Sequence, residues 1–232
     1  MTFSDIVFPD KIRPDDPCRC PLCRSDEVDA YHRDDSRAYM ACRTCGLVFV
    51  PEAFRLTPEE EKAVYDLHQN DPGDPGYQNF LSRLSVPLLK KLSPGSQGLD
   101  FGCGPGPALA DMMEAAGHSM NLFDPFYANT PEVLQHRYDF ICATEVVEHL
   151  RAPKREFESL FKMLKPGGWL GIMTKQVINR EAFGRWHYIR DLTHICFYSR
   201  FTFSCLARRF NAGLYFIGDD VILLQKQKKE CQ

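Results

Sequence analysis

The sequence predicts an α/β fold in which a doubly wound, mostly parallel sheet ends in a C-terminal antiparallel hairpin, preceded by a small cysteine-rich module. Short apolar runs alternate with amphipathic stretches between residues 96 and 175, which indicates parallel strands covered by helices. Two apolar runs flank Gly218-Asp219-Asp220 and predict the hairpin. Five of the ten cysteines lie within residues 18–50. We therefore expect three parts: an N-terminal arm and module over 1–50, a helical linker or lid over 51–95, and the main domain over 96–232.

Composition and charge narrow the class of protein. Hydrophobic residues make up 44% of the 232-residue chain and charged residues 25%, which is typical of a globular protein with its own core. The net charge of −3 gives no overall attraction to nucleic acids or anionic membranes. Residues 1–50 carry a net charge of −2, and residues 176–232 carry +4.

The chain shows no membrane span or secretory signal. No apolar run approaches the roughly 20 residues that a membrane helix needs. The N-terminal residues 1–5 lack a basic region followed by an apolar stretch. We expect a cytoplasmic protein, in which cysteines are metal ligands or buried thiols rather than disulfides. The oligomeric state is left open.

The region ahead of the main domain contains loose and helical segments. Residues 1–17 are polar and predict an arm, and the stretches 38–41 and 47–50 predict small strands around the cysteines. Thr57-Pro58-Glu59-Glu60 predicts a helix N-terminus with a capping box, and this helix is expected to reach His68.

A hinge or lid loop is predicted over residues 71–76, where prolines and glycines interrupt regular structure. A second amphipathic helix follows, with a candidate kink at Pro87. Its apolar residues fall at helical spacing: Phe80, Leu81, Leu84, Leu88 and Leu92.

Strands and helices alternate along the main domain. The expected strands are one ending at residues 99–101, then 120–123, 140–143 and 169–174. The expected helices are 107–116, ended by Gly117, then 155–164, stopped by Lys165-Pro166-Gly167-Gly168, and finally 200–209.

A glycine-rich loop follows the first strand of the main domain. Residues 100–106 read Asp-Phe-Gly-Cys-Gly-Pro-Gly, with Pro107 where a nicotinamide-binding fold needs its third glycine. Glycine lets the backbone turn tightly and approach a ligand, and the next helix offers unpaired N–H groups. A structural turn is the alternative. The absence of a G-K-[ST] loop argues against a nucleotide triphosphatase.

Asp124 ends the next predicted strand. An ionised carboxylate at that position can accept both hydroxyl protons of a ribose. The alternative is a turn-forming aspartate ahead of Pro125.

Residues 96–175 resemble the cofactor half of class I (Rossmann-like) S-adenosylmethionine-dependent methyltransferases. The glycine loop is similar to that family's first motif, and Asp124 to its ribose-binding acid. Residues 138–150 (Tyr-Asp-Phe-Ile-Cys-Ala-Thr-Glu-Val-Val-Glu-His-Leu) resemble the fourth motif, and residues 164–170 resemble the turn before the fifth strand. The four motifs occur in the family's order, and the likeness is strongest to the ubiquinone-biosynthesis-type methylase group.

The resemblance implies roles by position. The glycine loop would lie under the methionine part of the cofactor, Asp100 near its amino group, and Asp124 beside the ribose. Glu148 and His149 would brace the loop rather than react. The expected cofactor-binding residues are Asp100, Phe101, Gly102, Cys103, Gly104, Gly106, Asp124, Pro125, Phe126, Thr144, Glu145, Val146 and His149. Only thirteen residues, 125–137, separate the predicted strand that ends at Asp124 from the fourth-motif strand. The family usually has a helix and a third strand there, so this segment must be abbreviated.

The cysteine spacing predicts a structural zinc site. Cys20 and Cys23 form one C-x2-C pair, and Cys42 and Cys45 form another, with eighteen residues between the pairs. Four cysteine ligands leave no open position, so catalytic zinc is not expected. The module resembles zinc ribbons fused ahead of methyltransferase domains. Free thiols are the alternative, and Cys18 has a poor spacing for a ligand.

Candidate catalytic residues follow the fifth strand, where doubly wound folds bind ligands. We expect His194 or His187 to act as a base, with Tyr188 or Asp191 orienting it. A polar loop is the alternative for each residue. A base is needed only if the acceptor is a hydroxyl, an acidic carbon or a protonated nitrogen.

Two functions follow from these observations. The first is a methyltransferase that uses S-adenosylmethionine on a small-molecule acceptor, by O-, C- or N-methylation. The second is an RNA or protein methyltransferase that docks its substrate on the zinc ribbon, although the module's negative charge makes nucleic acid unlikely as a partner.

Overall fold

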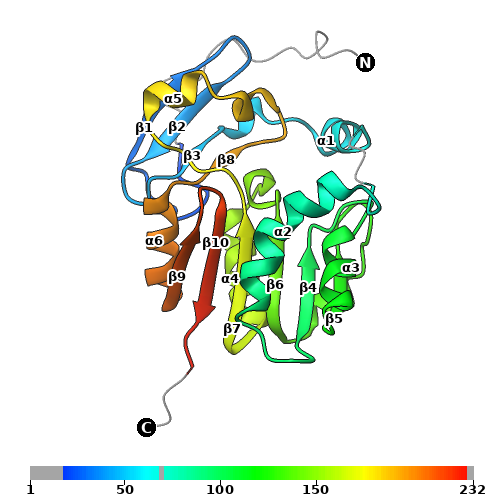
Figure 1. The fold of residues 1–232 in the computed structure, drawn as a ribbon. Coiled ribbons are helices and arrows are strands. Elements are labelled where there is room, and N and C mark those ends of the chain that lie inside the picture. Colours follow the sequence, from blue (N-terminus) through cyan, green and yellow to red (C-terminus); the bar gives the residue numbers. More distant parts are fainter. Residues whose placement is uncertain (1–17, 68–70, 229–232) are drawn as a thin grey trace.

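The computed structural model describes residues 18–67 and 71–228 (Figure 1). The arm expected over residues 1–17 lies outside the described residues. The helix expected to reach His68 ends earlier, at Tyr65.

The main domain is built on a six-stranded sheet with the order β5-β4-β6-β7-β10-β9. Strand β4 is parallel to β5 and β6, and β6 is parallel to β7, whereas β10 is antiparallel to both β7 and β9. The mostly parallel sheet with a C-terminal hairpin is therefore confirmed. The strands are β4 (Gln97–Phe101), β5 (Ser119–Phe123), β6 (Tyr138–Thr144), β7 (Leu164–Met173), β9 (Ala212–Ile217) and β10 (Val221–Lys226).

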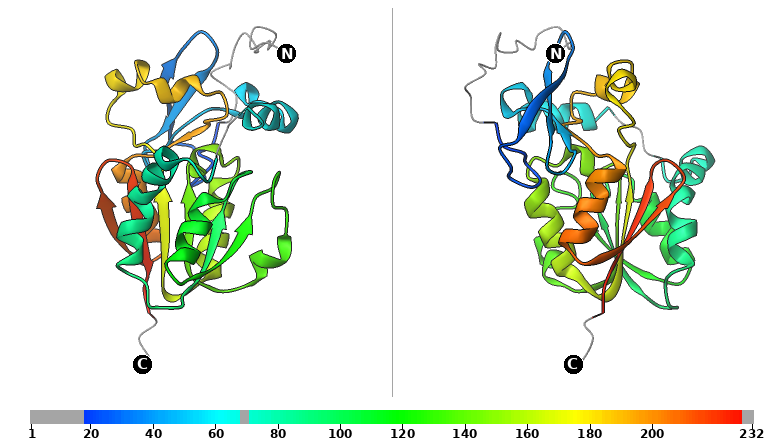
Figure 2. Two further views of the ribbon diagram at one scale, coloured as in Figure 1. Left: turned by 45° about the vertical axis from the view of Figure 1, so that its right-hand side comes forward. Right: turned by 90° about the vertical axis from the view of Figure 1, so that its left-hand side faces the viewer.

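Helices cover both faces of this sheet (Figure 2). Helices α2 (Pro75–Leu89) and α3 (Ala108–Ala115) lie on one face, and α4 (Pro153–Met163) and α6 (Arg200–Arg209) lie on the other. Because successive side chains of a strand point to opposite faces, Phe140 joins the core with α2 and α3 while its neighbour Ile141 joins the core with α4 and α6.

A second sheet of four strands contains the cysteine module. Its order is β1 (Val28–Arg33), β2 (Ala38–Cys42), β3 (Val48–Phe49) and β8 (Cys196–Phe197). Strands β2 and β3 match the two expected strands, whereas β1 and β8 were not predicted. Strand β8 comes from the C-terminal part of the chain and pairs antiparallel with β3. A segment that follows the parallel strands of the larger sheet thus completes the smaller sheet. The module lies above the carboxyl ends of the parallel strands (Figure 1).

Helix α1 (Pro58–Tyr65) begins as the sequence predicted. Thr57 accepts from the N–H of Glu60, and the Glu60 side chain accepts from the N–H of Thr57. The predicted break over 71–76 is shorter than expected, because Asp74 caps α2 and the helix begins at Pro75. Pro87 lies inside α2.

The predicted 155–164 helix is confirmed to within two residues at each end, but the run expected to stop it lies in a strand. Helix α4 ends at Met163, and Leu164 is already extended and pairs with Tyr138 as the first residue of β7. The Lys165-Pro166-Gly167-Gly168 run therefore lies in the strand rather than stopping the helix. The remaining helical segments are α5 (Arg180–Gly184) and the short 3-10 turns η2 (Glu52–Phe54), η3 (Pro131–Gln135), η4 (Val147–His149) and η5 (His187–Arg190).

The segment between β5 and β6 is abbreviated, as expected. It holds the turn η3 and an isolated bridge between Asp124 and Ala128, but no strand of the six-stranded sheet. Strand β5 is therefore one edge of that sheet.

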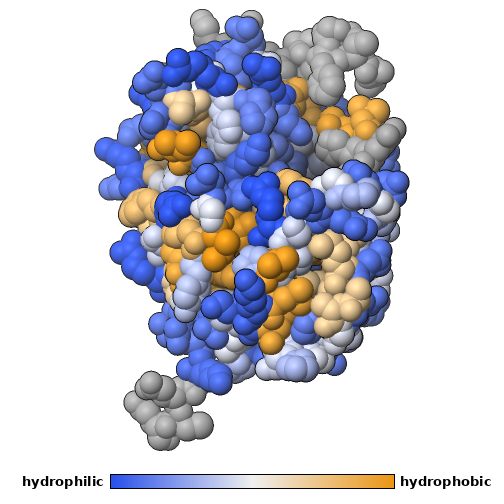
Figure 3. Space-filling model, in the orientation of Figure 1, coloured by the Kyte–Doolittle hydropathy of each residue, from blue (hydrophilic) through white to orange (hydrophobic). Residues whose placement is uncertain are grey.

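The face of the molecule in Figure 3 is largely hydrophilic, with apolar side chains gathered over the region of α2. Val86 of α2 is about half exposed, and Tyr215 of β9 is similarly exposed. None of the helices in the described part of the chain has both the length and the apolar character needed to cross a bilayer.

Candidate active site

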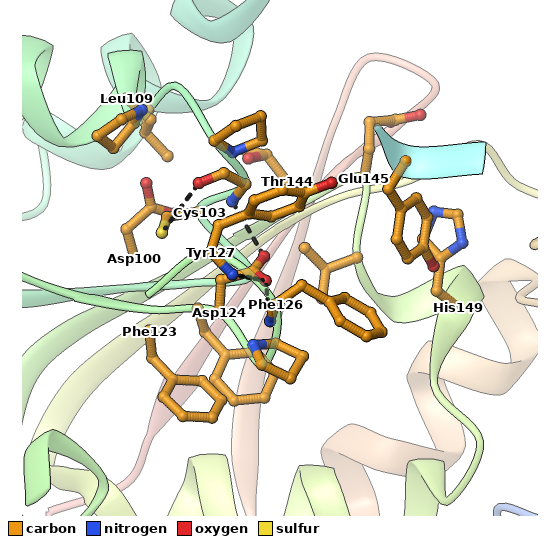
Figure 4. Close-up of a pocket in the computed structure, with 18 of the residues that line it drawn as sticks. Asp100, Cys103, Leu109, Phe123, Asp124, Phe126, Tyr127, Thr144, Glu145 and His149 are labelled. Atoms are coloured by element: carbon orange, nitrogen blue, oxygen red, sulfur yellow. Dashed lines mark hydrogen bonds between the residues drawn. The ribbon is translucent and has the colours of Figure 1, made fainter. Parts of the chain in front are cut away.

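A cavity of about 800 Å³ opens at the carboxyl ends of β4, β5 and β6. All thirteen of the predicted cofactor-binding residues line it. Several of them are drawn in Figure 4, where Asp100, Asp124, Thr144 and Glu145 surround one hollow. The parallel topology explains this convergence, because the carboxyl ends of neighbouring parallel strands meet at one edge of the sheet.

The glycine loop approaches β6 too closely for any side chain at Gly102. This residue has φ of +79°, and a Cβ atom there would lie 2.5 Å from Val146 Cγ2. Its N–H donates to Phe123 O at 2.7 Å, which ties the loop to the end of β5. Both the backbone conformation and the contact with Val146 therefore require glycine.

Asp124 connects the glycine loop to the loop after β5. Its Oδ2 accepts from the N–H of Gly104 at 3.0 Å, and its Oδ1 accepts from the N–H groups of Phe126 and Tyr127 at 2.8 and 3.2 Å. Figure 4 shows the carboxylate between the two loops. A carboxylate has about four lone-pair sites, so acceptor capacity is left for a ligand hydroxyl.

Asp100 is a buried carboxyl group at the bottom of the cavity. It is 2% exposed, and its Oδ1 has no hydrogen-bond partner among the described residues. Burial, together with the negative charge of Asp124, raises the pKa of Asp100 to about 7. A buried polar atom without a partner is costly, so this group is suited to a ligand that brings a donor or a positive charge.

Glu145 stands at the end of β6 in a strained conformation. Its φ is +52°, and its N–H donates to Met173 O at 2.8 Å. Such a conformation costs about 1–3 kcal/mol in a residue other than glycine, and it is concentrated at ligand sites. Burial raises the pKa of Glu145 to about 7, although the positive charge of Lys175 opposes this rise.

Aromatic side chains form a wall of the cavity. Tyr65 comes from α1, Tyr77 and Phe80 from α2, and Phe126 and Tyr127 from the loop after β5. Tyr127 donates to Asp66 Oδ1 at 2.7 Å, so the end of α1 is held against that loop. The cavity residues of α1 and α2 were not predicted, because in the sequence an aromatic residue at helical spacing is indistinguishable from a core residue.

The other end of the cavity holds two histidines and a carboxylate. The rings of His149 and His194 are 4.7 Å apart, and Asp191 Oδ2 is 3.7 Å from His194 Nε2. His194 Nδ1 lies 2.8 Å from the carbonyl oxygen of Tyr188, and a carbonyl can only accept. This contact therefore places the hydrogen on Nδ1, which makes Nε2 the acceptor nitrogen of the neutral ring.

Burial and nearby charges shift the pKa values of His149 and Asp191 at this end of the cavity. Burial, and the charge of the neighbouring His194, lower the pKa of His149 to about 4, so this ring is neutral. Burial raises the pKa of Asp191, but His194 and the hydrogen bonds from Thr193 outweigh it, and the pKa lies below its ordinary value. An ionised Asp191 beside His194 stabilises the imidazolium form of that ring.

The four catalytic candidates occupy different places. Asp191 and His194 line the cavity. Tyr188 lies beneath it, where its hydroxyl donates to Glu148 Oε1 and its ring packs 4.0 Å from that of His194. His187 lies outside, with its Nε2 2.7 Å from Lys175 Nζ.

Glu148 is fully buried and is not among the residues that line the cavity. Burial and the negative charge of Glu145 raise its pKa to about 8, so the group keeps a proton at neutral pH. Its backbone carbonyl accepts from the N–H of Ile195 at 2.8 Å. This backbone hydrogen bond ties the segment after β6 to Ile195, next to His194.

The four cysteines of the module converge at one point. Their Sγ atoms all lie within 4.8 Å of one another. Cys20 and Cys45 are 3.6 Å apart at sulfur, and Cys23 and Cys42 are 3.4 Å apart. Sulfurs at about 2.3 Å from a tetrahedral zinc ion are roughly 3.8 Å apart, so the cluster has the dimensions of such a site.

Fold and cavity define a doubly wound α/β protein with a cavity at the carboxyl edge of its parallel strands, lined by a glycine loop and an acidic residue. Residues 75–214 match the model of a methyltransferase domain family. The chain belongs to this family. No curated protein matches the chain.

Three solved structures are similar to this chain at low sequence identity. The 1,6-didemethyltoxoflavin-N1-methyltransferase of Burkholderia thailandensis, solved with 1,6-didemethyltoxoflavin and S-adenosylhomocysteine, is 16% identical with a TM-score of 0.53, over 86% of this chain and 100% of that one. An O-methyltransferase family protein of the same organism is 13% identical with a TM-score of 0.49, over 74% of this chain and 60% of its own. The N-methyltransferase NodS of Bradyrhizobium japonicum is 18% identical with a TM-score of 0.44, over 66% and 96%.

Proposed function

We propose that this methyltransferase transfers the methyl group of S-adenosylmethionine to a small-molecule acceptor. The observation that carries the proposal is the single cavity, which has the glycine loop and two acidic residues at one end and His194 with Asp191 at the other. A structural neighbour with S-adenosylhomocysteine and a small acceptor bound has this fold.

The residues at the first end fit the cofactor. Asp100 offers an unpartnered buried oxygen for the cationic amino group of the methionine part. Asp124 offers acceptor capacity for the ribose, and Phe126 an aromatic face for the adenine. When bound, S-adenosylmethionine supplies a methyl group already activated by its positive sulfur, so the protein has mainly to orient and desolvate the acceptor.

At the second end, His194 takes the proton of the acceptor. The new bond joins the acceptor atom to the methyl carbon as the carbon–sulfur bond breaks, and the sulfur keeps that electron pair. The proton of the acceptor passes to His194 Nε2, and Asp191 stabilises the charged ring. Tyr188 O holds Nδ1 and so fixes which nitrogen accepts the proton.

The cavity favours a small acceptor over an RNA or protein. The cysteine module, which would serve as the docking surface for a macromolecule, packs instead on the segment of its own chain that contains β8. The cavity also contains acidic groups, Glu145 and Asp191, that would repel nucleic acid phosphates.

Calorimetric titration with S-adenosylmethionine and S-adenosylhomocysteine tests the proposal, followed by an assay of S-adenosylhomocysteine release with a panel of small hydroxyl, amine and acidic-carbon acceptors. Binding of both nucleosides and turnover of at least one acceptor class are expected. Failure of both nucleosides to bind would overturn the cofactor assignment. Turnover of RNA or protein in place of every small acceptor would overturn the acceptor assignment.

The affinity for S-adenosylmethionine is expected to rise with pH between pH 6 and 8. Asp100, with its pKa raised to about 7, keeps its proton at the lower pH and pairs with an ammonium group only when ionised. Below that pKa the affinity rises by at most about tenfold per pH unit. The ordinary pKa of this carboxyl group is 3.8, and in the folded protein it is about 7. Between pH 3.8 and 7 the unfolded chain therefore loses this proton more readily than the folded protein does, so Asp100 makes the ligand-free protein less stable as pH rises through that range.

Calorimetry across this pH range measures the effect, and Asp100→Asn serves as the matched control. The variant should lose the part of the pH dependence that Asp100 contributes, and Glu145, whose pKa is also about 7, contributes the rest. A wild-type affinity that does not change between pH 6 and 8 would contradict the role given to Asp100.

We further propose that the four cysteines hold one structural zinc ion. Freshly purified protein is expected to contain about one zinc per chain, and replacing Cys20 or Cys45 with serine should remove it and lower the thermal unfolding temperature. Zinc binding contributes on the order of 10–16 kcal/mol in isolated zinc-finger peptides, so the loss should be large.

Elemental analysis by mass spectrometry and a thermal melt measure the outcome. Cys205→Ser is the matched control, because Cys205 is a partly exposed thiol on α6 outside the four-cysteine cluster. Metal-free wild-type protein, or a Cys205→Ser variant that loses the ion equally, would count against the assignment.

A further inference from the structure

Arg37 of the cysteine module is buried against the loop that carries the candidate base. It is 1% exposed, although arginine is rarely buried to this extent. Its guanidinium donates to three backbone carbonyls, those of Ile189, Asp191 and Leu192, at 2.9, 2.8 and 2.8 Å. These acceptors lie more than 150 residues away in sequence. One side chain thus joins the module to a distant part of the chain.

The segment that Arg37 holds has little regular structure. The turn η5 ends at Arg190, and β8 begins only at Cys196. Between them lie Asp191 and His194, both of which line the cavity. The carbonyls that accept from Arg37 therefore belong to the backbone that places these two side chains.

The guanidinium itself is fixed from the module side. Its Nε donates to Tyr39 Oη at 2.9 Å, and Tyr39 Oη donates to Asp34 Oδ2 at 2.6 Å. Asp34 Oδ1 accepts from the N–H of Arg37 at 2.8 Å, which closes a turn ahead of β2. The planar fork of arginine, with its donors in fixed directions, matches several carbonyls at once, whereas a lysine ammonium is a point charge.

One short strand connects Arg37 to the cysteine cluster. Strand β2 begins directly after Arg37 and ends at Cys42, a member of the cluster. A strand of this length spans about 17 Å, and its backbone is held by pairing with both β1 and β3. A change in the structure of the cysteine cluster would therefore also move the Arg37 guanidinium.

We propose that Arg37 is a positioning residue for methyl transfer: it holds the 189–192 backbone so that His194 and Asp191 face the cavity, and it makes the acceptor end of the site depend on the cysteine module. The catalytic consequence rests on the proposed function. The module thus has a role in catalysis through the Arg37 side chain, without contacting the acceptor.

Replacing Arg37 with methionine or lysine tests the proposal. We expect kcat to fall by roughly 10- to 100-fold in both variants, since a displacement of about 1 Å at a catalytic group has effects of this size. The Kd for S-adenosylmethionine should stay within about twofold, because the hydrogen bonds that hold Asp124 and Gly102 go to Gly104, Phe126, Tyr127 and Phe123, outside the loop that Arg37 holds. Metal content should be unchanged.

Arg43→Met is the matched control. Arg43 belongs to the same module, but its side chain is 63% exposed and pairs with an equally exposed Asp29. The control variant should retain the kcat and Kd of the wild type.

Hydrogen exchange supplies a readout that does not depend on activity. Protection of the amides in residues 187–195 should fall by at least about tenfold in the Arg37 variants, while that of β4, β6 and β7 is retained. Unchanged protection in this segment, or an equal loss across both sheets with loss of metal, would overturn the proposal. If Arg37→Met does not fold, Arg37→Lys keeps the charge and gives the same comparison.

The two proposals fail separately. A wild-type protein with no methyl-transfer activity would contradict the proposed function, and hydrogen exchange would still decide whether Arg37 holds the loop. Normal activity in Arg37→Lys with unchanged exchange would reject the positioning role alone.

Discussion

Replacing His194 with glutamine is expected to lower kcat by about 10²- to 10⁴-fold for an acceptor whose reacting atom carries a proton. Glutamine fills similar space and can still hydrogen-bond, but it cannot accept a proton near neutral pH. Because His194 lies at the opposite end of the cavity from the glycine loop, the Kd for S-adenosylmethionine should change by no more than about twofold. Steady-state release of S-adenosylhomocysteine measures kcat, and calorimetry measures Kd.

His187→Gln is the matched control for this experiment. His187 belongs to the same segment and is the same residue type, but it lies outside the cavity beside Lys175. Its replacement should leave kcat within about twofold of the wild type, since it removes no group at the reacting atoms. A His194→Gln variant that keeps more than about a tenth of the wild-type kcat would show that His194 is not the base.

Replacing Gly102 with alanine is expected to weaken S-adenosylmethionine binding by at least about 100-fold, because two costs add at one position. The backbone φ of +79° is unfavourable for any L-residue, and the new Cβ would lie 2.5 Å from Val146 Cγ2. Relief of this contact must move either the glycine loop or the end of β6, and both line the cavity. Calorimetric titration measures the affinity.

Two comparisons separate the causes. Gly117→Ala introduces a methyl group at φ of +87° where nothing lies within 4 Å, so it carries the backbone strain without the collision. That variant should lose some stability and bind the cofactor normally. Adding Val146→Ala to Gly102→Ala leaves only a 3.3 Å contact with Val146 Cβ and should restore part of the affinity. Equal affinity in Gly102→Ala and the wild type would contradict the placement of the cofactor over this loop.

The main-domain sheet and its glycine loop could be predicted from the sequence because their signals are local. A buried strand, the three loop glycines Gly102, Gly104 and Gly106, and a helix occur together within residues 97–115, and Asp124 follows directly after the next strand. The meeting of Cys20 and Cys23 with Cys42 and Cys45 could also be predicted from the sequence, because the two cysteines of each pair are held together by one short turn.

The acceptor end was less predictable because distant residues meet there. A two-residue strand such as Cys196–Phe197 has no periodicity of its own, and its pairing with Val48 depends on the folded domain. Nothing in the sequence around Arg37 distinguishes it from the exposed Arg43. His187 and His194 likewise have similar surroundings in the sequence, and only the path of the loop after η5 separates them.

Strand β8 has a consequence for the order in which the chain folds during synthesis. The four-stranded sheet needs Cys196 and Phe197, so its last ladder forms only after the ribosome has made all the parallel strands of the larger sheet. Contacts between residues so far apart in sequence are slow to form, because a long loop must close first. The growing chain therefore carries an incomplete N-terminal sheet, with the exposed edge of β3, through most of translation.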